Sequence, residues 1–162
     1  MSHIFCTARD SAFEQLCSLF EELDTLYRHM RPDLFCKPEG TARDRALVAG
    51  LIAGPDSTIL VAASAAGDEV FCLATLIIRR QPMLGVRRAR DYVEIDNLVV
   101  RQTARRRAIG RGLVQHALAW ASARGFGGVE LAVHTFNTDA VRFYDALGFA
   151  TTLRRMALMP IT

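Results

Sequence analysis

The chain of 162 residues is 51% hydrophobic and 23% charged, and its formal net charge is +3 at pH 7. This length and composition are ordinary for one globular domain with a sizeable core, and the net charge is too small for a dedicated nucleic-acid-binding protein. No apolar run approaches the roughly 20 residues that a transmembrane helix needs, and the first residues do not resemble a signal peptide. We therefore expect a single domain over residues 1–162 that does not associate with a membrane.

The cysteines give no indication of a disulfide framework or a metal site. They form no C-x-x-C pair, and no histidine lies near them at the spacing that zinc ligands require. The four are Cys6, Cys17, Cys36 and Cys72. We expect them to be reduced, and we expect the protein to be cytoplasmic and to hold no metal.

Apolar periodicity and turn residues predict the secondary structure along the whole chain. The first half reads as a strand at 3–8, a helix from Asp10 or Ser11 to about Tyr27, a loop at 31–40, a helix at 42–53, and strands at 57–63 and 69–79. The second half reads as a basic loop at 81–90, a strand at 92–100, a helix at 109–125, a strand at 129–134, a helix at 137–147, and short strands at 149–153 and 155–160. The order βααβββαβαββ predicts an α/β protein with a mixed sheet flanked by helices.

A basic turn between the strand at 92–100 and the next helix is a candidate anion site. We name residues 105–112 the cradle segment; it contains Arg105, Arg106, Arg107, Ala108, Ile109, Gly110, Arg111 and Gly112. The first turn of a helix offers free backbone N–H groups and the positive end of the helix dipole, and small residues let a phosphate approach them. Arginines add charge-assisted hydrogen bonds. The segment lacks the patterns of a Walker loop and of a dinucleotide-binding fingerprint, so a different phosphate or pyrophosphate ligand is predicted.

These residues resemble the GCN5-related N-acetyltransferases, the GNAT superfamily. Arg105, Ala108 and Gly110 take the places of the family's Gln/Arg-x-x-Gly-x-Gly/Ala signature, with Ala108 in place of the usual glycine. A second block is similar to the family's fifth strand, the asparagine that opens the next helix, and its Phe-Tyr…Leu-Gly-Phe ending; here it comprises residues 129–133, Asn137 and residues 143–149. The two blocks follow one another in the family's order.

The resemblance implies the fold and the co-substrate. It implies a mixed, mostly antiparallel sheet of about six to seven strands with about four helices, and acetyl-coenzyme A as the acetyl donor. The residues expected to bind the coenzyme are those of the cradle segment together with Leu98, Val99, Val100, Asn137 and Tyr144. In the family, a bulge at 98–100 frees backbone groups that pair with the pantetheine arm like an added strand.

Acetyl transfer also needs groups that move protons. An alkyl amine with a pKa near ~10 is mostly protonated at neutral pH, so a carboxylate near the acceptor can serve as the base. Glu94 matches the family's glutamate on this strand, and Asp96 lies two residues further on the same face. Either carboxylate could instead pair with an arginine such as Arg87 or Arg90, and solvent could take the proton. The resemblance assigns Tyr144 as the acid that protonates the leaving thiolate.

The acceptor site is less well defined by the sequence. His29 and Phe35 lie where the family's loop after the first helix walls the acceptor, so we expect them, with Glu94, to contact the substrate. The expected function is transfer of an acetyl group to a primary amine of a small molecule or a peptide, by direct attack in a ternary complex. A non-catalytic coenzyme-A-binding regulator, an enzyme acting on a protein N-terminus or aminoacyl-tRNA, and an RNA-directed module are the alternatives. The resemblance is compatible with a homodimer.

Overall fold

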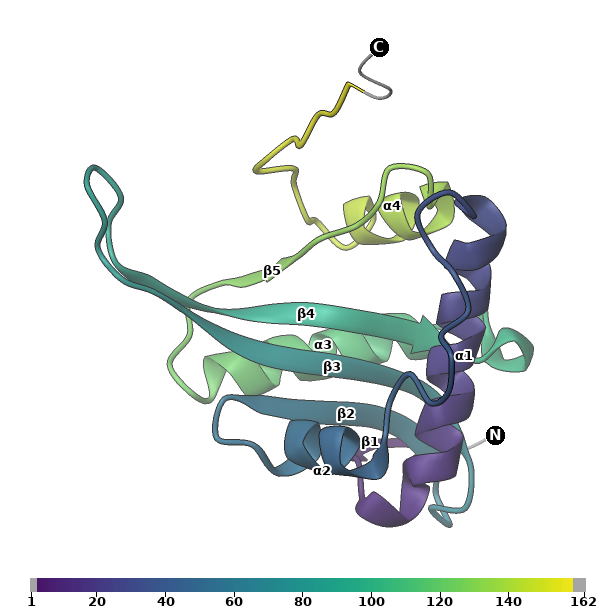
Figure 1. Cartoon of the computed structure of the whole chain (residues 1–162). Helices are drawn as coiled ribbons and strands as arrows, with labels where there is room; N and C mark the ends of the chain where they lie inside the picture. The colour runs from purple at the N-terminus through teal and green to yellow at the C-terminus, as the bar shows by residue number, and fades with distance from the viewer. Residues whose placement is uncertain (1–2, 159–162) are drawn as a thin grey trace. The chain divides into compact units, whose positions relative to one another are not determined.

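The computed structural model describes residues 3–158. The chain folds as two compact units, Met1–Ala132 and Val133–Thr162. The first unit contains the whole sheet and three of the helices, and the second contains the last helix (Figure 1).

The sheet of the first unit has five strands in the order β1-β2-β3-β4-β5. Their bounds are His3–Thr7 for β1, Ser57–Ser64 for β2, Val70–Gln81 for β3, Arg90–Val100 for β4 and Val129–Leu131 for β5. The first four strands pair antiparallel, and β5 pairs parallel to β4. The predicted mixed, mostly antiparallel sheet is therefore confirmed.

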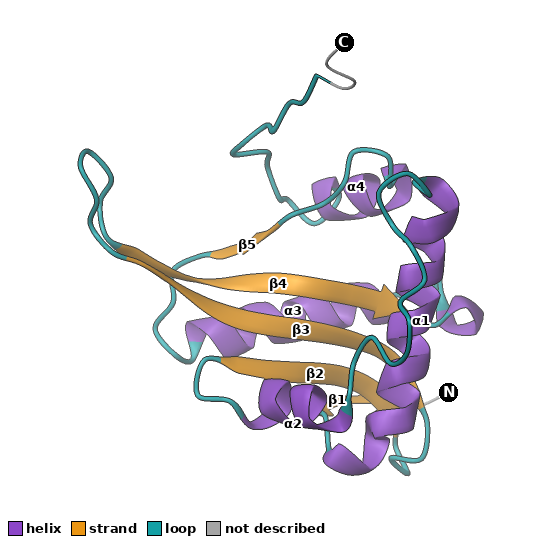
Figure 2. Cartoon of the chain, in the orientation of Figure 1, coloured by secondary structure: helices purple, strands orange, loops and turns teal. Residues whose placement is uncertain are grey.

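Helices cover both faces of this sheet (Figures 1 and 2). The helix α1 (Phe13–Met30) packs against β3 and β4, and α2 (Arg45–Ala53) packs against β2, on the face opposite to α3 (Ile109–Ser122). The α1 side chains that repeat at helical spacing meet the alternating inward residues of the strands. This core cluster includes Leu16, Leu19, Phe20, Val48, Ile59, Val61, Leu73 and Val99.

The helix α3 lies close to the edge strand β1 because a glycine faces it. A side chain at Gly112 would overlap the ring of Phe5, and Phe5 in turn stacks on His116 with the ring centroids 6.0 Å apart. The absence of a side chain at Gly112 therefore allows close packing of α3 on β1, whereas Leu113, Val114 and Ala117 fill the core beneath α3. This packing explains one of the two glycines of the cradle segment.

A β-bulge interrupts the pairing of β3 with β4 at Asp96. Thr75 pairs with Asn97 and Leu76 pairs with Ile95, so Asp96 has no partner residue across the ladder. An extra residue of this kind shifts the alternation of side chains by one position. Glu94 lies opposite Ile77, and Val99 lies opposite Leu73. As a consequence, Glu94 and Val99 lie on the same face of the sheet, the face that α1 and α2 cover.

In the second unit, α4 (Thr138–Asp145) begins at Asn137, whose side-chain oxygen accepts a hydrogen bond from the Ala140 N–H at 3.2 Å. The helix ends before Gly148, whose φ of +89° is a conformation that glycine adopts readily. These two positions confirm the predicted start and stop of the last helix.

The predicted strand at 149–153 is wrong, because residues 149–158 form no strand. The predicted strand at 155–160 is likewise not formed as far as residue 158, and its last two residues lie outside the described part of the chain. Short alternating runs specify a strand only when a neighbouring strand supplies hydrogen bonds. The element order is otherwise as predicted, with five strands in place of six or seven. Among the described residues, no helix is both long and apolar enough to cross a bilayer.

Candidate active site

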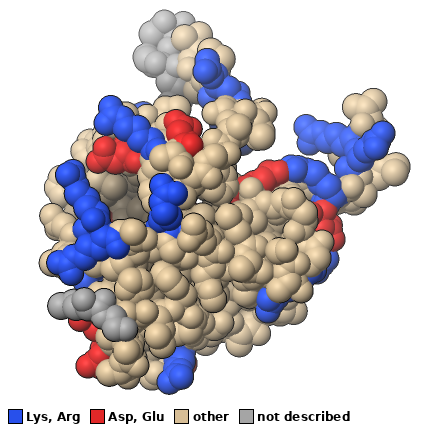
Figure 3. Space-filling model, turned by 180° about the vertical axis from the view of Figure 1, so that it is seen from behind, with Lys and Arg blue, Asp and Glu red and all other residues tan. Residues whose placement is uncertain are grey.

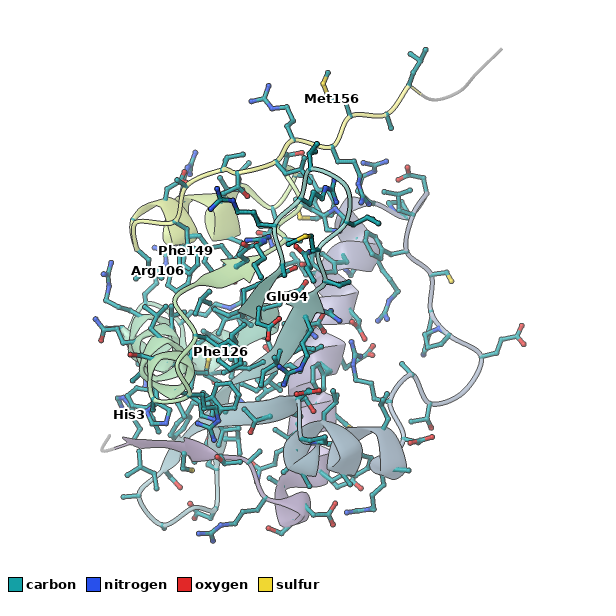
Figure 4. All side chains as sticks on the ribbon, turned by 90° about the vertical axis from the view of Figure 1, so that its left-hand side faces the viewer. His3, Glu94, Arg106, Phe126, Phe149 and Met156 are labelled. Carbon is teal, nitrogen blue, oxygen red and sulfur yellow. The ribbon has the colours of Figure 1, made fainter. Side chains whose placement is uncertain are left out.

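Glu94 and Asp96 share one arginine on the neighbouring strand. The Arg79 Nε group donates a hydrogen bond to Oε2 of Glu94, and the Arg79 Nη2 atom lies 3.9 Å from Oδ1 of Asp96. The hydrogen bond with Glu94 is the main cause that raises the pKa of Arg79 above its ordinary value. Asp96 also accepts a 2.6 Å hydrogen bond from the Asn97 amide. The strands β3 and β4 thus bring one guanidinium and two carboxylates together (Figure 4 labels Glu94).

The Glu94 carboxylate keeps one oxygen available. Its side chain is 22% exposed, and Oε1 has no hydrogen-bond partner among residues 3–158, in contrast to Oε2. The sequence analysis named Arg87 and Arg90 as examples of arginines that could pair with these carboxylates, but the arginine that pairs with Glu94 is Arg79. Arg90 pairs with Glu130, and the register of the β3–β4 hairpin places Arg79 diagonally across from Glu94.

The cradle segment has a strained backbone between β4 and α3. Arg106 and Ala108 both adopt φ of +60°, a left-handed conformation that costs non-glycine residues roughly 1–2 kcal/mol each. Ala108 is the residue that precedes α3, and no side chain caps that helix end. A glycine at position 108 would adopt this conformation with less strain.

This conformation leaves the first turn of α3 available to an anion. The first backbone N–H group of α3 with a partner inside the helix is that of Gly112, which donates to the Ala108 carbonyl at 3.0 Å. The N–H groups of the residues before Gly112 in the helix therefore have no partner within it. Arg105, Arg106, Arg107 and Arg111 are all exposed around this turn, and Figure 3 shows Lys and Arg side chains gathered at this end of the α3 face. The Arg105 Nε group donates to the Val100 carbonyl at 3.1 Å, which holds the start of the segment against the end of β4. The residues present therefore suit a pyrophosphate.

A small cavity lies beside the same turn. It has a volume of about 160 Å³ and is lined by His3, Phe71, Ala104, Arg107 and Ile109. Figure 4 shows His3 and Arg106 on the α3 side of the sheet. The cavity extends the cradle segment toward β1 with one cationic and several apolar groups.

The expected bulge at Leu98, Val99 and Val100 is wrong in its position. These three residues pair regularly with Ala74, Leu73 and Cys72, and the irregularity falls earlier, at Asp96. Asp and Asn side chains favour irregular backbone because they can hydrogen-bond to nearby backbone groups in place of the ladder, and the bulge falls at an Asp-Asn pair. The open edge of β4 is nevertheless present. In the described part of the chain, β5 pairs with Val93, Glu94 and Ile95 and no further.

The residues expected to wall the acceptor lie at the end of α1 and in the loop after it. His29 is exposed, and its Nδ1 atom lies 2.9 Å from the Thr25 carbonyl oxygen. Phe35 stacks on Tyr27 with the ring centroids 5.2 Å apart. Their role toward a substrate stays a prediction.

Asn137 and Tyr144 belong to the second unit. Asn137 caps α4, as described above. The Tyr144 ring is half-buried and packs edge-on against Phe149, with 5.6 Å between the ring centroids. Binding of the coenzyme by either residue stays a prediction.

Sequence reasoning missed two positions that the fold brings into the site. Arg79 could have been found by extending the hairpin register from the turn at 82–89, because antiparallel partners have a constant sum of residue numbers. Glu22 gave no such signal. Its carboxylate accepts hydrogen bonds from Arg101 and from the Gln102 N–H, residues about 80 positions away in the chain.

Comparisons with known proteins agree with the fold. A model of the acetyltransferase (GNAT) family matches residues 19–149. A comparison with curated protein sequences found no significant match.

Similar solved structures span nearly the whole chain. A tetramutant of the BH1408 protein from Bacillus halodurans is 24% identical, with a TM-score of 0.89 over 96% of this chain and 98% of that one. A GNAT family acetyltransferase from Staphylococcus aureus is 15% identical, with a TM-score of 0.67 over 99% and 100%. The aminoglycoside acetyltransferase meta-AAC0020 from an uncultured soil metagenomic sample is 12% identical, with a TM-score of 0.72 over 99% and 96%. At these identities the likeness concerns the fold.

The strain at Ala108 generates a prediction about stability. Ala108→Gly should raise the free energy of unfolding by ~0.5–1 kcal/mol, because relief of the left-handed strain exceeds the added entropy of the unfolded chain. Chemical denaturation measures the effect. The control is Ala119→Gly, at an exposed position inside α3, and its free energy of unfolding should fall by about 1 kcal/mol. A less stable Ala108→Gly variant would contradict the strain.

Proposed function

Because this chain belongs to the GNAT acetyltransferase family, we propose that it transfers an acetyl group from acetyl-coenzyme A to a primary amine of a small molecule or a peptide. The observation that carries the proposal is the cradle segment, in which a left-handed Ala108 and exposed arginines surround the open N-terminus of α3. The co-substrate supplies the acetyl group as an activated thioester. We propose that residues 1–162 act as one acetyltransferase domain.

The coenzyme would be held by the backbone as much as by side chains. The N–H groups of Ile109, Gly110 and Arg111 would bind the pyrophosphate, with charge from Arg105, Arg106 and Arg107. The β4 edge at 98–100 would pair with the extended pantetheine arm. Asn137 is proposed to touch the coenzyme in addition to capping α4.

Glu94 is the proposed base for the acceptor amine. At neutral pH only about one in a thousand molecules of an amine with pKa ~10 is neutral, so removal of its proton accelerates attack. The Oε1 atom of Glu94 can take this proton directly or through water, while Arg79 holds Oε2. Asp96 would assist by attracting the cationic amine. Tyr144 is proposed to give a proton to the leaving thiolate, in keeping with its assignment by family resemblance.

Partners and location complete the proposal. His29 and Phe35 would contact the acceptor. We propose no dedicated role for nucleic acid, membrane or metal. Among residues 3–158, no group of three His, Cys, Asp or Glu side chains could hold a metal ion. The protein is proposed to be cytoplasmic, in line with its four free cysteines, of which Cys72 is so buried that its pKa rises to about 12. A homodimer is compatible with these roles.

One observation favours a second candidate, a coenzyme-A-binding regulator that does not catalyse. The hydrogen bond between Arg79 and Glu94 is what a purely structural carboxylate would also make. The two functions differ in whether thiol is released from acetyl-coenzyme A.

The test of function is thiol release with a panel of acceptors: amino acids, polyamines, aminoglycosides, simple amines and peptides. We expect release that depends on an acceptor and a product heavier by one acetyl group in mass spectrometry. Binding of acetyl-coenzyme A in calorimetry without turnover on any acceptor would favour the regulator. Absence of binding would refute both candidates.

Glu94→Gln tests the base. With one good acceptor, kcat/KM should fall by ~10²-fold near neutral pH, because proton removal is lost, and the defect should shrink at high pH, where neutral amine is abundant. Asp96→Asn is the matched control on the same strand and should affect mainly the KM of the acceptor. A larger defect in Asp96→Asn would reverse the assignment, and no defect in either variant would leave the proton to solvent.

Tyr144→Phe tests the acid by removing one oxygen. The variant should bind acetyl-coenzyme A normally and lose ~10²-fold in kcat, because the thiolate leaves without a proton. Single-turnover kinetics measure the chemical step separately from product release. Phe143→Leu, at the neighbouring position in α4, controls for packing. Equal rates for Tyr144→Phe and the parent protein would restrict Tyr144 to packing against Phe149.

A further inference from the structure

Arg101 joins three elements at the point where β4 ends. Its backbone N–H donates to the Phe71 carbonyl at 2.8 Å, and its Nε group donates to the Val70 carbonyl at 3.2 Å. The strand β3 therefore binds both the backbone and the side chain of Arg101. Its Nη1 group reaches α1, where Ser18 Oγ lies at 3.4 Å and Glu22 Oε1 at 3.3 Å. The side chain is 21% exposed. Arg101 therefore fixes the end of β4 against both β3 and α1.

Glu22 holds the next residue by its backbone. Its second carboxylate oxygen, Oε2, accepts the Gln102 N–H at 2.9 Å. Gln102 begins a short 3-10 helix, Gln102–Ala104, and the first N–H groups of a helix have no partner within it. Glu22 satisfies one of these groups and places a negative charge at this helix end, which the helix dipole favours. One carboxylate from α1 thus binds two consecutive residues of the chain.

These contacts lead directly into the cradle segment. The Ala104 N–H donates to the Arg101 carbonyl at 2.8 Å, and the Arg105 N–H lies 3.4 Å from the Gln102 carbonyl. The Glu22 carboxylate thus binds the Gln102 N–H, and the Gln102 carbonyl binds the N–H of Arg105, the first arginine of the segment. One and three residues further on, Arg106 and Ala108 adopt their strained left-handed conformations. A strained turn keeps its shape only when its surroundings hold it.

We propose that Glu22 and Arg101 are positioning residues that hold the cradle segment in the conformation that binds the coenzyme pyrophosphate. The inference rests on the proposed function for the ligand. Neither side chain contacts the segment itself. Both act through the residues that lead into it, because Glu22 accepts the Gln102 N–H and the Arg101 carbonyl accepts the Ala104 N–H. Loss of the Glu22 carboxylate frees the Gln102 N–H and releases the first residue of the 3-10 helix, so the free N–H groups of α3 and the arginines no longer converge in advance on one anion.

A matched pair of ion pairs on α1 allows a specific test. The side chains of Glu22 and Arg101 are 27% and 21% exposed. Asp24 lies two residues after Glu22 on α1 and pairs with Arg43, and their side chains are 25% and 22% exposed. The Asp24 pair binds the loop before α2 and makes no contact with residues 100–112 among the described hydrogen bonds and ion pairs. Removal of either carboxylate should cost similar stability, whereas only Glu22 should affect the coenzyme.

The experiment compares Glu22→Ala and Asp24→Ala by thermal unfolding and by calorimetric titration with coenzyme A. We expect Glu22→Ala to weaken coenzyme A binding by ~10-fold or more, about 1.4 kcal/mol per decade, and Asp24→Ala to change it by less than about twofold at a similar melting temperature. Glu22→Gln should restore part of the affinity, because its amide oxygen can still accept the Gln102 N–H.

In turnover, Glu22→Ala should raise the KM for acetyl-coenzyme A and leave the KM for the acceptor unchanged. Equal weakening by Glu22→Ala and Asp24→Ala, or unchanged affinity in Glu22→Ala, overturns the inference. Parent protein that binds no coenzyme A refutes the proposed function instead and removes the ligand on which the inference rests. Parent protein that binds coenzyme A but does not turn over leaves this test intact, because binding is its readout.

Discussion

The extra residue at Asp96 is the constraint on which the candidate site depends. In a regular strand, Glu94 and Val99 would point to opposite faces of the sheet, because side chains alternate. The bulge shifts the alternation once, so Val99 packs into the core under α1 while Glu94 reaches Arg79 on that same face. Without the bulge, either Val99 would point away from the core under α1, or Glu94 would point to the face under α3.

Pairs of arginine and carboxylate side chains on the α1 side of the sheet orient polar groups more than they contribute to the stability of the fold. Arg79 with Glu94, Arg101 with Glu22, and Arg43 with Asp24 are all partly exposed, and such pairs contribute little to stability, typically about 0–1 kcal/mol each. Their guanidinium groups fix direction, because a planar donor binds a carboxylate in a limited set of geometries. The stability comes from the apolar cluster between α1, α2 and the sheet. The pairs then determine where the polar groups of the site lie.

Much of the candidate site could be predicted because its signals are local. The cradle segment follows a strand and precedes a helix within a few residues, and its small and cationic residues are adjacent in the chain. The left-handed conformation of Ala108 was not predicted, since alanine by itself favours negative φ. The bulge was placed two residues too late, because a regular strand pattern does not show which residue is extra. The last two strands were overpredicted from short alternating runs in a segment that forms no strand up to residue 158.

The sequence by itself determined the order of the elements as far as α4, the caps at Asn137 and Gly148, the cradle segment and the two carboxylates of β4. These depend on periodicity, turn chemistry and charge over short distances, which are written in consecutive residues. The hairpin register indicates Arg79 as a neighbour of Glu94, but only the tertiary structure decided that Glu22 holds Arg101 and Gln102. The register of a hairpin and the packing of α1 against the end of β4 bring these groups together. Contacts between residues about 80 positions apart result from the folding of the whole sheet, and no local pattern records them.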